Sequence, residues 1–195
     1  MSPSPTSVLV IGAHREELSF GEQVAAGLTD EPIEILRIPV GISGRHPRQD
    51  EVFRYRVCHQ ELYLQLRQQL KGRYRLLIDL HAGQDPNGPM ADLMCHDQSL
   101  LGCVRRRLSA PGAPPACRER VRLIPLVAAD GSGLAADAGG ASRPLGRALI
   151  PRSVWAMQEP VYAAVEVFLR EPGSGRPDDW SLARELVRHI LKCCP

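Results

Sequence analysis

Apolar and polar positions along the first half of the chain predict strands and helices in alternation. Residues Ser7–Gly12 form a short apolar run with β-branched side chains, which predicts a strand buried on both faces. Leu18–Leu28 is predicted as a helix that ends before Pro32, and Ile33–Ile38 alternates like a second strand. The Gly- and Pro-rich segment Pro39–Gln49 is predicted as a loop.

A long helix and a strong core strand are predicted next. Asp50 is a candidate N-cap for a helix that runs to about Lys71, where Gly72 stops it. Tyr74–Leu80 (YRLLIDL) then predicts a core strand. The candidate buried residues of the long helix include Val52, Leu62, Leu66 and Leu70.

The second half of the chain is less regular. The predicted strands are Asp92–His96, Val121–Leu126 and Val161–Leu169. The predicted helices are Gln98–Leu108 and an amphipathic helix that Asp178 or Ser181 caps and that runs to Leu191. Ser109–Ala116 and Glu171–Pro177 are predicted as a loop and a turn. The long segment Ala128–Gly146, rich in Gly, Ala, Ser and Asp, predicts either a functional loop such as a lid or a disordered one.

Strands separated by helices predict an α/β fold with parallel strand pairs. A length of 195 residues without an internal repeat suits one domain, so we expect a single domain over residues 1–195, with residues 1–6 flexible. In such sheets, functional sites form beyond the carboxyl ends of the strands. Polar residues that follow a predicted strand are therefore the first candidates for chemistry.

Charge and composition exclude several classes of partner. The net charge of +2 is too small, and the basic triplet at residues 105–107 too short, to predict nucleic-acid binding. The first apolar run is too short for a signal peptide or a membrane span, so we expect a cytoplasmic protein with no membrane partner. The six cysteines show no CxxC spacing, and we expect reduced, mostly buried thiols and no cysteine-based zinc site. The oligomeric state is left open.

Candidate metal ligands follow two of the predicted strands. His14 comes just after the first strand, and Glu17 lies three residues later, on the same face if a helical turn opens there. His81 directly follows the core strand, so the three side chains meet at one edge of the sheet if the two strands are parallel. Two histidines and one glutamate are a recurring ligand set for catalytic zinc. Asp79 points to the same side of its strand as His81 and is predicted to orient that imidazole.

The segment Gly12-Ala-His14-Arg-Glu-Glu17, followed by Ile78-Asp-Leu-His81, resembles the signature of the zinc carboxypeptidase superfamily, especially its aspartoacylase/succinylglutamate desuccinylase branch. The resemblance implies a three-layer α/β/α domain with a mixed, largely parallel sheet and one Zn²⁺ per chain on His14, Glu17 and His81. It also implies hydrolysis of an amide bond, as in an N-acyl amino acid deacylase. A carboxypeptidase-like metallopeptidase is the alternative within the family. In both cases the partner would be a small molecule or short peptide with a carboxylate.

Two acidic residues late in the chain are candidates for the general base that such a hydrolase needs. Glu166 interrupts an apolar strand, where a carboxylate is costly unless it is paired or faces a site. Glu159 lies in a more polar stretch before Pro160 and fits a solvated loop residue. The family places its catalytic glutamate in a late strand before a turn and the last helix, so Glu166 is the preferred base.

Two arginine segments also resemble the family. Arg54-Tyr55 is similar to the segment whose arginine polarises the scissile carbonyl, and Arg152-Ser153 is similar to an Arg-Ser that helps to bind substrate. Surface arginines are the alternative interpretation of both segments. The family's Asn-Arg pair, which clamps the carboxylate of the substrate, has no counterpart in His59–Leu62, so the residue that recognises a carboxylate stays open.

A protein of a different class is compatible with the same residues. It would be a metal-binding or interaction protein that has kept the site without the chemistry, with His96 and Asp97 as additional ligands unless this pair forms a turn or helix cap. A doubly wound nucleotide-binding protein is disfavoured, because no Gly-rich phosphate turn follows the first strand.

Overall fold

The computed structural model describes residues 6–43, 47–112, 114–127 and 150–194 of the chain. The predicted loop Ala128–Gly146 lies outside the described residues, as does the predicted flexible N-terminal segment apart from Thr6. In the described part of the chain, no helix is long and apolar enough to cross a membrane.

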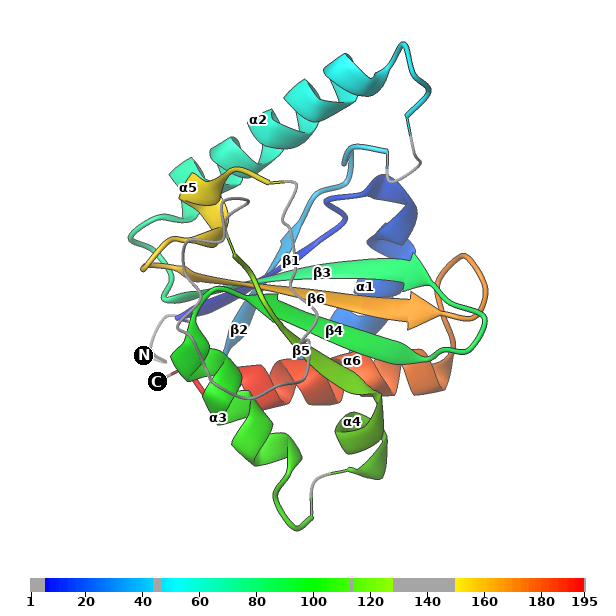
Figure 1. The fold of residues 1–195 in the computed structure, drawn as a ribbon, viewed down its shortest axis with the longest axis vertical. Coiled ribbons are helices and arrows are strands. Elements are labelled where there is room, and N and C mark those ends of the chain that lie inside the picture. The colour runs from blue at the N-terminus through cyan, green and yellow to red at the C-terminus, as the bar shows by residue number, and fades with distance from the viewer. Residues whose placement is uncertain (1–5, 44–46, 113, 128–149, 195) are drawn as a thin grey trace.

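A sheet with the strand order β2-β1-β3-β6-β4-β5 lies at the centre of the described structure (Figure 1). Neighbouring strands are parallel, except that β4 runs antiparallel to β6. The prediction of a mixed, largely parallel sheet is therefore confirmed. The strands are β1 (Ser7–Ile11), β2 (Ile33–Arg37), β3 (Leu76–Gln84), β4 (Met90–Cys95), β5 (Val121–Pro125) and β6 (Val161–Leu169).

Helices cover both faces of this sheet and complete the predicted α/β/α layers (Figure 1). The longest helix, α2 (Val52–Leu70), lies on one face together with α5 (Arg152–Trp155). The opposite face carries α1 (Leu18–Ala25), α3 (Gln98–Leu108), α4 (Pro115–Arg120) and α6 (Pro177–Leu191). A one-turn 3-10 helix, η1 (Arg15–Glu17), directly precedes α1.

The central strands are buried on both sides because each face packs against helices. On β1, Leu9 and Ile11 join the apolar cluster with α1, α3 and α6, whereas Val8 and Val10 join the cluster with α2 and α5. All four side chains are inaccessible to solvent. Asp79 on β3 is equally inaccessible, so a carboxylate lies inside the layer between the sheet and α2.

Several predicted boundaries differ from the structure. The core strand does not end at Leu80 but continues as β3 through His81 to Gln84, because it pairs with β6 over its whole length. The long helix begins at Val52 with Glu51, not Asp50, as its N-cap. The last helix begins at Pro177, and neither Asp178 nor Ser181 is its N-cap, because Arg176 occupies that position. The short helices α4 and α5 were not predicted.

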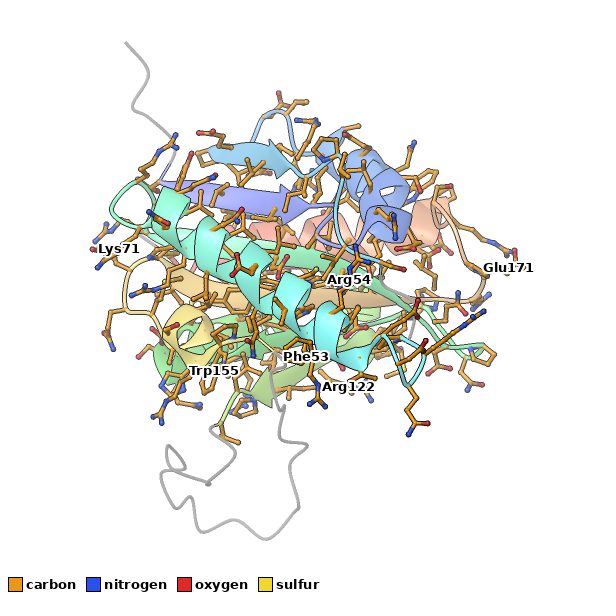
Figure 2. All side chains as sticks on the ribbon, turned by 90° about the horizontal axis from the view of Figure 1, so that it is seen from above. Phe53, Arg54, Lys71, Arg122, Trp155 and Glu171 are labelled. Carbon is orange, nitrogen blue, oxygen red and sulfur yellow. A yellow bond between two sulfur atoms is a disulfide. The ribbon has the colours of Figure 1, made fainter. Side chains whose placement is uncertain are left out.

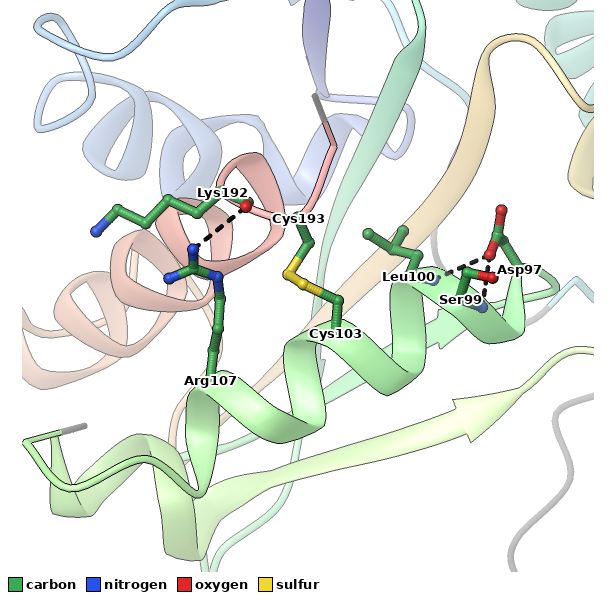
Figure 3. The surroundings of a disulfide bond; sticks show 7 residues. All are labelled: Asp97, Ser99, Leu100, Cys103, Arg107, Lys192 and Cys193. Atoms are coloured by element: carbon green, nitrogen blue, oxygen red, sulfur yellow. Dashed lines mark hydrogen bonds between the residues drawn. A yellow bond between two sulfur atoms is a disulfide. The ribbon is translucent and has the colours of Figure 1, made fainter.

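The prediction that all six cysteines are reduced is wrong for one pair. Cys103 on α3 and Cys193, just after α6, form a disulfide bond across the face opposite to α2 (Figure 3). They are 90 residues apart in the chain, and only the packing of α3 beside α6 brings their Cα atoms to 5.8 Å. Spacing in the sequence contains no sign of such a pair. The remaining four cysteines are free thiols.

Candidate metal centre

The turn after β1 positions two of the predicted ligands. His14 is the N-cap of η1 and Glu17 is its last residue, so the two side chains lie on one side of a single tight turn. Gly12 makes this turn possible, because it has a φ of +80° and a Cβ there would lie 2.6 Å from the carbonyl oxygen of Ile38. The backbone of His14 also forms a bridge to Ile42, which fixes the turn against the following loop.

The third predicted ligand reaches the same point from β3. Since β1 and β3 are parallel neighbours, residues beyond Ile11 and beyond Leu80 share one edge of the sheet. Glu17 contacts both imidazoles: its Oε1 lies 2.8 Å from His14 Nδ1, and its Oε2 lies 3.0 Å from His81 Nδ1. The two rings have centroids 5.0 Å apart. The structure therefore brings His14, Glu17 and His81 together as the sequence predicts.

This cluster has the dimensions of a metal site. One ligand atom from each of the three residues lies within 4.8 Å of the other two. Bonds of about 2.1 Å at tetrahedral angles place neighbouring ligand atoms roughly 3.4 Å apart, only slightly farther than the 2.8 and 3.0 Å contacts of Glu17. Burial would raise the pKa of Glu17, but hydrogen bonds to His14 and His81 outweigh burial and hold it below its usual value. An ionised carboxylate between two imidazoles suits a divalent cation.

Asp79 orients His81, as predicted. Its Oδ2 lies 3.0 Å from His81 Nε2 and also accepts hydrogen bonds from the hydroxyls of Tyr63, at 2.8 Å, and Tyr162, at 2.7 Å. A proton on Nε2 is thereby favoured, and Nδ1, on the side of Glu17, is the nitrogen that would bind a metal. Burial would lower the pKa of His81, but the charge of Asp79 holds it well above the usual value. The same negative environment would attract a metal cation.

Sequence reasoning missed His59, which lies on α2 beside the cluster. The residue is almost completely buried, and its ring centroid is 6.0 Å from that of His14 and 4.9 Å from that of Tyr63. Burial, followed by the proximity of His14 and His81, lowers the pKa of His59 to about 4, so the ring is neutral at pH 7. Its position in one helical stripe with Leu66 and Leu70 was the available signal.

Glu166 lies next to the cluster on the neighbouring strand. It is the register partner of His81 in the β3–β6 pair, and register partners project from the same face. A Cβ on Gly83 would lie 2.7 Å from Glu166 Oε1, so this glycine leaves room for the carboxylate. Burial raises the pKa of Glu166. The alternative acid, Glu159, is exposed before the amino end of β6, where it forms a 4.0 Å ion pair with Arg75.

The two predicted arginines lie on the surface. Arg54 is exposed on the first turns of α2 (Figure 2), and Arg152 is exposed at the start of α5. Within the described residues, no hydrogen bond or ion pair joins either of them to the cluster. The proposed additional ligands also lie elsewhere: His96 contacts the carbonyl of Leu126, and Asp97 caps α3 by accepting from the backbone of residues 99 and 100 (Figure 3).

The sequence matches no protein-family model and no curated protein, but solved structures share its fold. A point mutant of murine aminoacylase 3 aligns with a TM-score of 0.50 and 18% identity, over 98% of this chain and 64% of that one. Unmutated murine aminoacylase 3 gives 0.49 and 16% over 98% and 65%, and succinylglutamate desuccinylase from Chromobacterium violaceum gives 0.48 and 16% over 96% and 60%. The chain therefore spans somewhat less than two thirds of these proteins. The similarity to the mutant aminoacylase 3 structure is one of fold, and it agrees with the predicted α/β architecture.

Proposed function

We propose that this chain is a zinc-dependent hydrolase that cleaves an amide bond, with one Zn²⁺ held by His14, Glu17 and His81 and with Glu166 as the general base. The observation that carries the proposal is the convergence of the three ligand atoms within 4.8 Å, with Glu166 in register beside His81. Two histidines and one carboxylate leave a position for water or substrate, which is the ligand set of a catalytic site. Zinc in such a site supplies polarisation of the carbonyl and activation of water.

The residues of the chain supply the remaining chemistry. Glu166 would take the proton from the attacking water and return it to the leaving amine. Its buried position raises its pKa toward the range in which a carboxylate both accepts and donates a proton efficiently. Asp79 holds His81 in the tautomer that ligates through Nδ1. In line with the sequence resemblance, Arg54 is proposed to stabilise the oxyanion and Arg152 to bind substrate.

The substrate class is proposed from the fold and the ligand set. The aligned structures include an aminoacylase, and we extend amide hydrolysis of a small acylated amino acid or short peptide to this chain. A test starts with metal analysis of the purified protein, followed by turnover of a panel of N-acyl amino acids and short peptides. Protein without a stoichiometric transition metal would contradict the proposal.

Three single variants separate metal binding from catalysis. Glu17→Ala removes the ligand that contacts both imidazoles and should lose zinc. Glu166→Gln should keep zinc but lose about 10²–10⁴-fold in turnover, the usual contribution of a general base. Glu159→Gln is the matched control, because it makes the same change at an exposed glutamate and should keep both zinc and turnover. Zinc binding without turnover of any panel member would instead favour a non-catalytic metal-binding protein.

A further inference from the structure

A row of polar side chains crosses the sheet beside the proposed metal centre. His81 on β3 is the register partner of Glu166 on β6, Glu166 is the partner of Asp92 on β4, and Asp92 is the partner of Arg122 on β5. Register partners project from the same face of a sheet, so all four side chains lie on the face that carries α2. The row starts at the metal ligands and ends at an arginine on the outermost strand of the sheet.

Arg122 is held over the sheet and does not extend freely into solvent. Its Nε donates to Asp92 Oδ1 at 2.6 Å and its Nη2 donates to Oδ2 at 2.8 Å, while Asp92 is only 5% exposed. The guanidinium also lies 5.6 Å from the ring centroid of Phe168, which follows Glu166 by two residues on the same face of β6. The cation therefore leans from β5 across β4 toward the strand that carries the proposed base.

The guanidinium still has donors to offer. An arginine has five N–H groups, and the two hydrogen bonds to Asp92 use two of them. Among the described residues no other hydrogen bond to this side chain is found, and 48% of its surface is exposed. Figure 2, which looks onto this face, shows Arg122 beside α2 and not beneath it. A planar guanidinium held by a carboxylate and an aromatic ring is already oriented for a second carboxylate.

We propose that Arg122 binds a carboxylate of the substrate, so that the enzyme prefers acylated compounds with an anionic group on the far side of Glu166 from the metal centre. This inference rests on the proposed function, because the metal ligands fix where the scissile amide lies. Asp92 lies two strands from His81, a distance of about 10 Å at the usual strand spacing. A substrate whose carboxylate is several bonds from its amide can span the distance from the metal centre to the guanidinium bound by Asp92. Arg122 would then fill the role for which the sequence has no Asn-Arg pair.

The carboxylate can belong to the acyl group or to the amine, and one set of binding measurements separates these sources. For the acyl side, the zinc-loaded protein is titrated with the monohydroxamates of succinic, glutaric and adipic acid. The neutral counterparts keep the hydroxamate and carry a carboxamide in place of the free carboxylate. In both sets the hydroxamate binds the metal and positions the rest of the molecule. For the amine side, N-acetyl-L-aspartate and N-acetyl-L-glutamate are compared with their neutral diamides, in which both carboxylates are carboxamides, as competitors of acetohydroxamate.

In at least one series the anionic compound should bind about tenfold or more tightly than its neutral counterpart, as expected for a charge-assisted hydrogen bond. Arg122→Gln should remove this preference while zinc content and acetohydroxamate binding stay unchanged. The double variant Asp92→Asn/Arg122→Gln avoids an unpaired buried carboxylate and should behave in the same way. Arg106→Gln, the same change on α3 on the opposite face, should keep the preference.

Each outcome has a distinct meaning. A preference for the anion in one series only assigns the carboxylate to that side of the substrate and supports the inference. No preference in either series, or a preference that survives in both Arg122 variants, overturns it while the proposed zinc hydrolase stands. If the protein binds neither zinc nor any hydroxamate, the proposed function itself has failed.

Discussion

The hydroxyls of Tyr63 and Tyr162 offer a way to test how the metal centre is supported without changing any proposed ligand. Both donate to Asp79 Oδ2, the oxygen that also contacts His81. Replacement by phenylalanine removes one hydroxyl and leaves the apolar packing of the ring in place. The change therefore weakens the stabilisation of the Asp79 carboxylate and the orientation of His81, which the Tyr63 hydroxyl also contacts directly at 3.3 Å from Nε2.

The structure sets the size of the expected effect. Asp79 is completely buried, and within the described residues its Oδ1 has no hydrogen-bond partner, so Oδ2 receives all the stabilisation the carboxylate has. A hydrogen bond to a charged group contributes about 1.5–3 kcal/mol to the free energy of unfolding. Each single Tyr→Phe variant should therefore lose about 2 kcal/mol, and the double variant should lose more than either, although not additively, since both hydroxyls share one acceptor. Zinc affinity should fall by about 10- to 100-fold.

Urea denaturation of the metal-free variants measures the loss of stability, and competition with a zinc chelator measures the loss of affinity. Tyr74→Phe is the matched control, because Tyr74 is also buried on the α2 face but its hydroxyl hydrogen-bonds the exposed Glu34 and contacts Arg73 at 3.4 Å, not Asp79. It should change stability by less than about 1 kcal/mol and leave zinc affinity unchanged. If Tyr63→Phe and Tyr162→Phe behave like this control, the two hydroxyls do not support the site.

Three further predictions concern the room that Gly83 leaves for Glu166, the reactivity of the free thiols and the effect of zinc on stability. Gly83→Ala should lower kcat at least tenfold with little loss of stability, because the added methyl group would displace the flexible end of the Glu166 side chain. An unchanged kcat would mean that the Glu166 carboxylate is not the general base. Iodoacetamide at pH 8 should label the exposed Cys58 in the native protein but not Cys95, because burial raises the Cys95 pKa to about 12; mass spectrometry of the peptides reads out both sites. Zinc at 100 times its Kd should stabilise the metal-free protein by about 2.7 kcal/mol in thermal unfolding, and Glu17→Ala should abolish this gain.

Hydrophobic patterns located the described strands well, because a strand buried on both faces leaves a short, continuous apolar run. They failed where tertiary contacts decide the end of an element. The strand that contains His81 continues to Gln84 because β6 pairs with it there, and its last residues are polar or small since they border the site. The helices α4 and α5 are only six and four residues long, too short to be stable without the packing of buried residues such as Cys117 and Trp155.

The cluster of candidate metal ligands was predictable because its geometry is local. His14 and Glu17 are three residues apart, and His81 is joined to them by one pair of parallel strands, which alternating strands and helices already imply. His59 was not found, because on a long, mostly polar helix the stripe that it shares with Leu66 and Leu70 is a weak signal for burial. Its side chain enters the site only because α2 packs its C-terminal two thirds on the sheet, where the buried residues of this helix lie.

The position of the Asp92–Arg122 pair beside these residues, by contrast, depends on the direction of a single strand, β4. If β4 ran parallel to β6, the carboxyl ends of β4 and β5 would lie at the edge of the sheet that carries His81. Cys95 and Pro125 would then lie nearest to this edge. Because β4 is antiparallel, Asp92 and Arg122, near the start of their strands, come into line with Glu166 and His81. A β-strand pattern contains no information on direction, so this half of the site becomes visible only once the sheet is assembled. Two of the variants test whether the cluster of metal ligands and the Asp92–Arg122 pair act on one substrate. Arg122→Gln should weaken the binding of anionic ligands only. Glu17→Ala should weaken the binding of every ligand that binds through zinc.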